Sequence, residues 1–109
     1  MAATHDPQLL KGVLSLVLLR LLDERESYGY EVVQRLHDLG LVDVQEGTVY
    51  PALARLEREG RVRSRLLPSS DGPARKYYRP TADGRAALVD GTSQWLAFVD
   101  IVTSALTPG

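Results

Sequence analysis

Cysteine is absent from the 109-residue sequence, and histidine occurs only twice. Without cysteine the chain has no disulfide, no thiolate nucleophile and no cysteine-based zinc site. His5 and His37 are too far apart to form a recognisable ligand motif, so we expect no metal and no cofactor. The serines show no Ser-His-Asp order, and no glycine-rich phosphate loop follows a strand. We therefore expect that the protein is not an enzyme.

Long apolar runs are also missing. The most apolar stretch, Leu9–Leu22, is interrupted by Lys11 and Arg20 and is shorter than the ~20 residues that cross a bilayer. It has neither the basic flank nor the small-residue cleavage site of a signal peptide. We expect no membrane association and a cytoplasmic location.

Charge is nearly balanced over the chain, with a formal net charge of −1, but it is unevenly distributed. Residues 1–45 have four basic and seven acidic side chains, residues 46–85 have nine and five, and the remainder has two acidic ones. A basic block of this kind is typical of a surface that meets phosphates. The length and the 44% hydrophobic content fit a single domain with one core.

Hydrophobic periodicity predicts three helices in the first sixty residues. The first, Asp6–Arg25, is apolar on nearly every side and must be covered, in part by a second chain. The second runs from an N-cap at Ser27 to a stop at Gly40, and the third covers Glu46–Glu59 and ends at Gly60. Helix, short turn, helix is the resulting arrangement.

The third helix is predicted to have two different faces. Val49, Leu53 and Leu56 fall on one side and pack inward. The opposite side collects small residues and two guanidinium groups: Gly47, Thr48, Pro51, Ala54, Arg55 and Arg58. Small side chains permit close approach to a nucleic-acid groove, and arginine reaches base edges or phosphates. The alternative is that Thr48, Tyr50 and Pro51 simply begin a core helix.

A basic β-hairpin follows. Arginines alternate with other residues over Arg61–Arg65, the segment Pro68–Pro73 is rich in turn residues, and Arg75–Arg79 forms a second strand. This hairpin is either a phosphate-facing wing or a solvated strand face. Lys76 and Tyr78 share one side of the second strand, so both sides cannot meet DNA equally and at least one tyrosine belongs to the core.

A last helix is predicted from a cap at Thr81 to Leu106, with Gly91–Ser93 as a potential bend. Its apolar residues fall in a seam, which comprises Leu88, Trp95, Val99, Val102 and Leu106. A terminal helix this apolar favours pairing with a second chain.

Three segments in this order resemble the PadR family of transcriptional regulators: YGYE at 28–31, EGTVYPALARLE at 46–57 and RKYYRPT at 75–81. The resemblance extends from Leu9 to Leu106 and is closest to the short subgroup with a single C-terminal helix. It implies a mainly α fold with a small β-hairpin, in which a winged helix-turn-helix (residues 1–80) and a C-terminal dimerisation helix (residues 81–109) form one compact unit. It also implies a homodimer in which the first and last helices intertwine between chains.

The resemblance implies contacts with double-stranded DNA from the third helix and the wing. The candidate contacts are Tyr28, Gly47, Thr48, Tyr50, Pro51, Arg55, Arg58, Arg75, Lys76 and Tyr78. Tyr28 has two readings, a hydroxyl bond to phosphate or packing at the helix entry. Trp95, with Phe98 and Leu16, is the candidate site for a small aromatic effector, or else these side chains anchor the dimer and fill its interface themselves.

The sequence thus predicts a sequence-specific DNA-binding transcriptional regulator. We expect a ligand-responsive repressor that binds a near-palindromic operator as a homodimer. The alternative is a winged-helix protein-interaction module, with the basic surface directed to an acidic protein partner.

Overall fold

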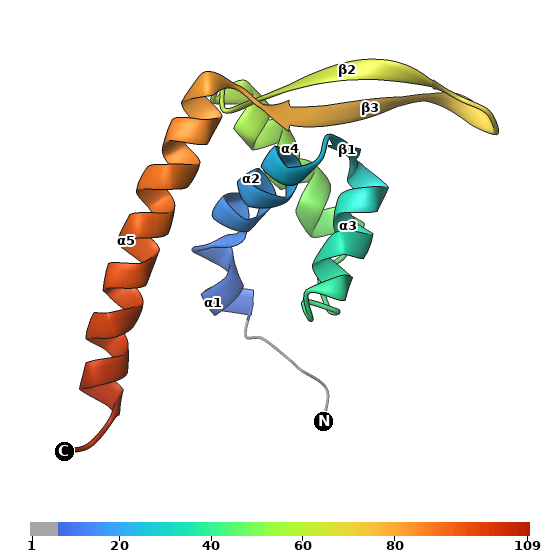
Figure 1. The fold of residues 1–109 in the computed structure, drawn as a ribbon. Helices are drawn as coiled ribbons and strands as arrows, with labels where there is room; N and C mark the ends of the chain where they lie inside the picture. The colour runs from blue at the N-terminus through green and yellow to red at the C-terminus, as the bar shows by residue number, and fades with distance from the viewer. Residues whose placement is uncertain (1–6) are drawn as a thin grey trace.

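The computed structural model describes residues 7–109, which form five helices and a three-stranded antiparallel sheet (Figure 1). The helices are α1 (Pro7–Lys11), α2 (Leu14–Glu24), α3 (Gly29–Asp38), α4 (Glu46–Arg58) and α5 (Ala82–Leu106). The strands are β1 (Ser27–Tyr28), β2 (Val62–Ser69) and β3 (Gly72–Pro80). The predicted fold class, mainly α with a small β-hairpin, is confirmed.

The core lies where α2, α3 and α4 meet beneath the sheet. Leu18 of α2, Leu36 of α3 and Leu53 of α4 are completely buried. Each such side chain contributes about 1.5–3 kcal/mol through removal from water. This cluster fixes the side of α4 that faces inward, and therefore the side that faces solvent.

The N-terminal helix is broken, contrary to the prediction of one helix over 6–25. The α1 helix ends at Lys11, and α2 begins at Leu14 after a turn in which Val13 N donates to Leu10 O at 2.9 Å. Gly12 is a poor helix former at this point. The turn allows both Leu10 and Leu14 to reach the core.

The start of α3 also differs from the prediction. Ser27 is not its N-cap but a buried residue of β1, and its hydroxyl donates to Arg25 O at 3.2 Å. Tyr28 takes the N-cap position, where its backbone N donates to Glu31 Oε1 at 3.2 Å. The predicted glycine stops are confirmed, because Gly40 and Gly60 have φ of 109° and 77°, values that favour glycine.

The strands are ordered β1-β3-β2, with Ser27 opposite Tyr78 and Arg63 opposite Arg79. The hairpin of β2 and β3 extends away from the helices as a long arm (Figure 1). One face of its base, which includes Val62 and Tyr78, packs on the core, and by strand alternation the arginines at 63 and 79 lie on the other face.

The α5 helix is anchored at its first turn. Thr81 Oγ1 accepts from Gly84 N at 3.1 Å and donates to Gly60 O at 2.7 Å, which confirms Thr81 as the cap. The helix is continuous through 91–93, so the potential bend there does not interrupt it. Its C-terminal end extends beyond the other helices (Figure 1). No described helix has the length and apolar character needed to cross a membrane.

Candidate nucleic-acid interface

One exposed stripe follows the length of α4. Gly47, Pro51, Ala54 and Arg58 are separated by four, three and four residues, so they lie on one side of the helix, opposite the buried Leu53. Pro51 has no N–H, which leaves the Gly47 carbonyl without its usual helical donor. The stripe therefore presents a small, closely approachable surface that ends in a guanidinium group.

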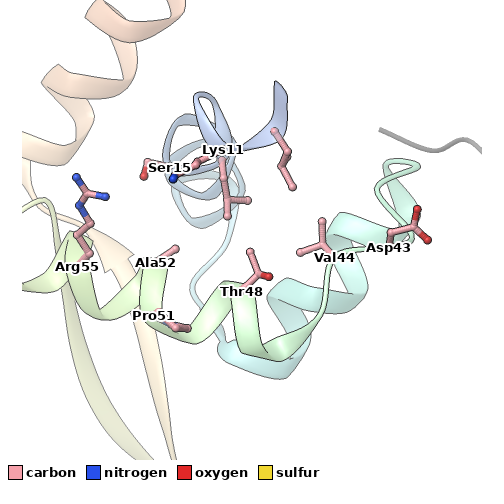
Figure 2. A pocket seen from close by; sticks show the side chains of 10 residues that line it. Lys11, Ser15, Asp43, Val44, Thr48, Pro51, Ala52 and Arg55 are labelled. Atoms are coloured by element: carbon pink, nitrogen blue, oxygen red, sulfur yellow. The ribbon is translucent and has the colours of Figure 1, made fainter. Parts of the chain in front are cut away.

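Thr48 and Arg55 lie beside this stripe rather than on it. They line a cavity of about 640 Å³ between α4 and the N-terminal helices, with Lys11 and Ser15 across from them (Figure 2). Arg55 Nε also lies 3.3 Å from Glu59 Oε2, an exposed pair one helical turn apart. Arg55 is thus partly committed to its own helix, whereas Arg58 forms no ion pair with any residue in the described range 7–109.

Tyr50 connects α4 to the start of α3. Its ring packs so closely on Gly29 that a Cβ atom at position 29 would lie 2.2 Å from the Tyr50 Cε1. Burial, and then the nearby charge of Glu46, raise the pKa of the Tyr50 hydroxyl above its ordinary value. The phenol stays protonated at neutral pH, and because the residue is exposed it can still donate a hydrogen bond.

Glu57 joins α4 to the hairpin. Its Oε2 accepts from Ser64 Oγ of β2 at 2.5 Å, and its Oε1 lies 3.0 Å from Lys76 Nζ of β3. The bonds from Ser64 and then Lys76 lower the pKa of the Glu57 carboxyl. Among residues 7–109 Glu57 forms no ion pair with an arginine of its own helix, whereas Glu59 pairs with Arg55.

The predicted wing contacts lie on opposite sides of β3. Lys76 and Tyr78 face α4, whereas Arg75 lies on the other side, with its Cζ 4.5 Å from the centre of the Tyr28 ring. Tyr28 also meets Tyr77 edge to face, with ring centres 5.2 Å apart. The Tyr28 ring thus packs in an aromatic cluster with Arg75 and Tyr77.

Tyr78 is a predicted DNA contact that the structure places in the core. Only 6% of its surface is exposed, and Lys76 Nζ lies over its ring at 5.6 Å. The reason is the pairing of β3 with β1, which places Tyr78 opposite the buried Ser27 and over the core. The prediction that at least one tyrosine of this strand belongs to the core is confirmed, and that tyrosine is Tyr78.

The predicted effector residues come together between α2 and α5. Leu16, Trp95 and Phe98 line a single cavity of about 460 Å³, with Gly91 at its wall in contact with Leu16. Trp95 and Phe98 remain 41% and 58% exposed. The tryptophan is therefore accessible to a ligand or to a second chain.

Metal ligands are sparse. Within residues 7–109 the structure contains no group of three His, Asp or Glu side chains able to hold a metal ion. His37 Nε2 lies 2.7 Å from the Val44 carbonyl oxygen, a contact that ties the end of α3 to the turn before α4. His5 lies outside the described residues.

The chain matches the family model described as the transcriptional regulator PadR-like family over residues 18–90, more than half its length. A PadR-like transcriptional regulator from Bacillus cereus is 36% identical, with a TM-score of 0.83 over 94% of this chain and 99% of that one. A PadR family regulator from Eggerthella lenta is 33% identical, with a TM-score of 0.85 over 94% and 88% of the two chains.

Transcriptional regulator Rv3488 from Mycobacterium tuberculosis is 42% identical over 71 residues, which is 62% of this chain and 61% of that protein. The solved relatives share the arrangement of helices and hairpin described above. The chain belongs to the PadR-like family of transcriptional regulators, DNA-binding proteins of the winged-helix class and not enzymes.

Proposed function

We propose that the protein is a sequence-specific repressor that binds a near-palindromic operator as a homodimer and is released by a small aromatic effector. The observation that carries the DNA-binding part is the exposed stripe of α4, in which Gly47, Pro51 and Ala54 precede Arg58. The small residues allow the helix backbone to approach base edges in the major groove, where Arg58 can pair with guanine or phosphate.

The other predicted contacts surround this stripe. Thr48 and Arg55 reach the groove from the side that faces α1 and α2, and Tyr50 reaches it from the side that faces α3. Lys76 and Arg75 contact flanking phosphates from the hairpin. Because Lys76 and Arg75 each have an acidic neighbour in the free protein, DNA phosphates must compete for these two cations.

The α5 helix is the proposed dimer arm. The helix exposes large apolar side chains, which are unfavourable on a helix that faces only solvent. They are Val89, Trp95, Leu96, Phe98, Ile101 and Leu106. Leu9 of α1, 75% exposed, adds to this surface. Burial of such a surface against a second copy is the usual way to remove it from water. In this proposal, residues 1–80 contact DNA and residues 81–109 pair the chains.

Pairing through α1 and α5 gives the dimer two copies of the proposed DNA-contacting surface. Two copies of α4 related by a two-fold axis read two half-sites about one turn of B-DNA apart, so the operator has inverted symmetry. The cavity of Leu16, Trp95 and Phe98 adjoins the proposed pairing surface. A flat aromatic effector bound there alters the relative position of the two subunits and thereby the spacing of the two α4 helices.

Selection of duplexes from a random pool tests the proposal. We expect enrichment of one sequence with two inverted half-sites, bound at least about a thousandfold more tightly than random DNA. Arg58→Ala is the matched control variant and is expected to bind the selected duplex more weakly. Its exposed side chain can be removed without opening the core. If no sequence is enriched while the chain captures an acidic protein partner, the protein-interaction alternative replaces this proposal.

A further inference from the structure

Four arginines from different parts of the chain line one cavity of about 460 Å³ at the base of the hairpin. Arg25 follows α2, Arg63 belongs to β2, Arg79 to β3 and Arg85 to the first turn of α5. We call this site the basic cavity. It lies on the face of the sheet opposite α4, because Ser64 and Lys76, which contact Glu57 of α4, occupy the alternate positions of the same strands.

Arg63 and Arg79 are direct cross-strand partners in the register of β2 and β3. Two like charges opposite one another in an antiparallel pair destabilise the sheet. Neither guanidinium forms an ion pair or hydrogen bond with a residue in the described part of the chain. The hairpin therefore keeps a repulsive pair at its base that forms no ion pair with residues 7–109.

The neighbouring carboxylates are largely engaged elsewhere. Three acids line the cavity: Asp23, Glu24 and Glu26. Both oxygens of Glu26 accept from Arg65, at 2.7 and 2.9 Å, although Arg79 is near enough to help lower the Glu26 pKa. Glu24 binds Arg35 at 3.1 Å and Arg20 at 3.2 Å. Only Asp23 has neither oxygen in such a pair within residues 7–109.

The four guanidinium groups thus outnumber the uncommitted carboxylates of the cavity. One of the four, Arg85, donates to the Pro80 carbonyl oxygen at 3.5 Å, which holds it at the start of α5. Planar guanidinium groups with free N–H donors match the oxygens of a phosphate group in a bidentate manner. A concave site with an excess of such groups has the chemistry of a polyanion site.

We infer that the basic cavity binds a small phosphate-bearing anion, such as a pyrophosphate-containing metabolite, at a place separate from the DNA-binding surface of α4. The anion bridges Arg63 and Arg79 and so removes the repulsion between β2 and β3. Arg25 and Arg85 close the site from α2 and α5. Occupancy stabilises the base of the hairpin against the rest of the domain.

Titration calorimetry with inorganic pyrophosphate at low ionic strength tests this inference. The wild-type chain binds the probe, and the affinity falls as salt is raised. The double variant Arg63→Gln, Arg79→Gln weakens binding by at least about tenfold, because two charge-assisted contacts are removed. Arg58→Gln is the matched control, since it removes an exposed arginine from α4 and leaves pyrophosphate binding unchanged.

Thermal melting gives a second readout that does not need the ligand. In phosphate-free buffer the single variant Arg63→Gln raises the melting temperature by about 1–5 °C, because the like-charge pair is relieved. Pyrophosphate then raises the melting temperature of the wild type more than that of this variant. A lower melting temperature for Arg63→Gln without the ligand contradicts the inference.

Two other results overturn it. Equal pyrophosphate affinity in the wild type and in the double variant shows that the basic cavity is not the site. If a pre-bound operator duplex blocks pyrophosphate, the cavity belongs to the DNA interface and not to a small anion. Loss of operator binding in Arg58→Gln with pyrophosphate binding intact separates this site from the proposed function.

Discussion

Glu57 of α4 and Lys76 of β3 are joined by an ion pair of 3.0 Å, and the same carboxylate accepts a hydrogen bond from Ser64 of β2. One side chain of α4 therefore holds both strands of the hairpin. This contact links the hairpin to α4 in addition to the packing of the core. Lys76 retains half of its side-chain surface for solvent or phosphate.

Replacement of Glu57 tests this clamp. Glu57→Gln is expected to lower the free energy of unfolding by about 0.5–1 kcal/mol at neutral pH, a magnitude typical of a partly exposed pair. Because the folded-state pKa lies below the ordinary value of 4.5, the carboxylate contribution is present above pH 4.5 and is lost as the pH falls through the folded pKa. Urea unfolding at several pH values measures it. A difference between wild type and variant that grows below pH 4.5 would contradict this assignment.

Arg58 and Arg55 are predicted to differ in their importance for operator binding. Arg58→Ala weakens binding by about 1–3 kcal/mol if the side chain pairs with guanine. Arg55→Ala weakens it less, because Arg55 must first leave Glu59 and lies on the flank that faces α1 and α2. Fluorescence anisotropy with a selected duplex compares the two variants. The reverse order of effects would move the centre of the interface to the Thr48 and Arg55 side of α4.

Gly84 is predicted to be the glycine least tolerant of substitution. A Cβ atom there would lie 1.9 Å from the Arg61 carbonyl oxygen, which belongs to the backbone and cannot move aside cheaply. Gly84→Ala is therefore expected to destabilise the fold by about 1–3 kcal/mol. Gly47→Ala is the control, since nothing lies within 4 Å of its Cβ position and alanine favours a helix. Thermal unfolding separates the two, and equal melting temperatures would refute the close approach of α5 to Arg61.

Trp95 is predicted to strengthen association of two chains. The residue is 41% exposed and lines a largely apolar hollow together with Leu9, Phe98 and Val102. Trp95→Ala removes the largest side chain of this surface and is expected to weaken dimerisation by about 2 kcal/mol or more. Sedimentation equilibrium measures the change, with Asp90→Ala as the control, an exposed residue of the same helix outside the lining of this cavity. An unchanged association constant for Trp95→Ala would exclude the tryptophan from the pairing surface.

The helix bounds near α4 and α5 were predictable because local chemistry decides them. Gly60 stops α4 in a left-handed conformation, and Thr81 caps α5 with its own hydroxyl. The buried face of α4 followed from the spacing of Val49, Leu53 and Leu56 alone. Such signals lie within one or two helical turns of the residues they control.

The errors arose where distant segments decide the structure. Strand β1 exists because Ser27 and Tyr28 pair with Tyr78 and Tyr77, fifty residues away, and the same pairing buries Tyr78. No local pattern in 26–30 indicates a strand. The break at Gly12 likewise depends on where the core receives Leu10 and Leu14. Tertiary contacts override helix propensity in both places.

The charge of the site was also only partly predictable from the sequence. The sequence located the excess of arginine over 46–85, but it could not indicate which cations are neutralised within the fold. The bond between Arg65 and Glu26 joins residues 39 apart in the chain, and Lys76 finds Glu57 across 19. Arg58, Arg63 and Arg79 are left without such partners among residues 7–109, which separates the surface into one region on α4 and another at the base of the hairpin.

Titration of a selected duplex with the protein, repeated over a range of salt concentrations, tests the central claim most directly. Two chains presenting α4 and the hairpin to one operator predict a stoichiometry of two chains per duplex and a linear fall of log K with log salt, with a slope of roughly −4 or steeper. Binding of a single chain, or an affinity that does not change with salt, would contradict the account.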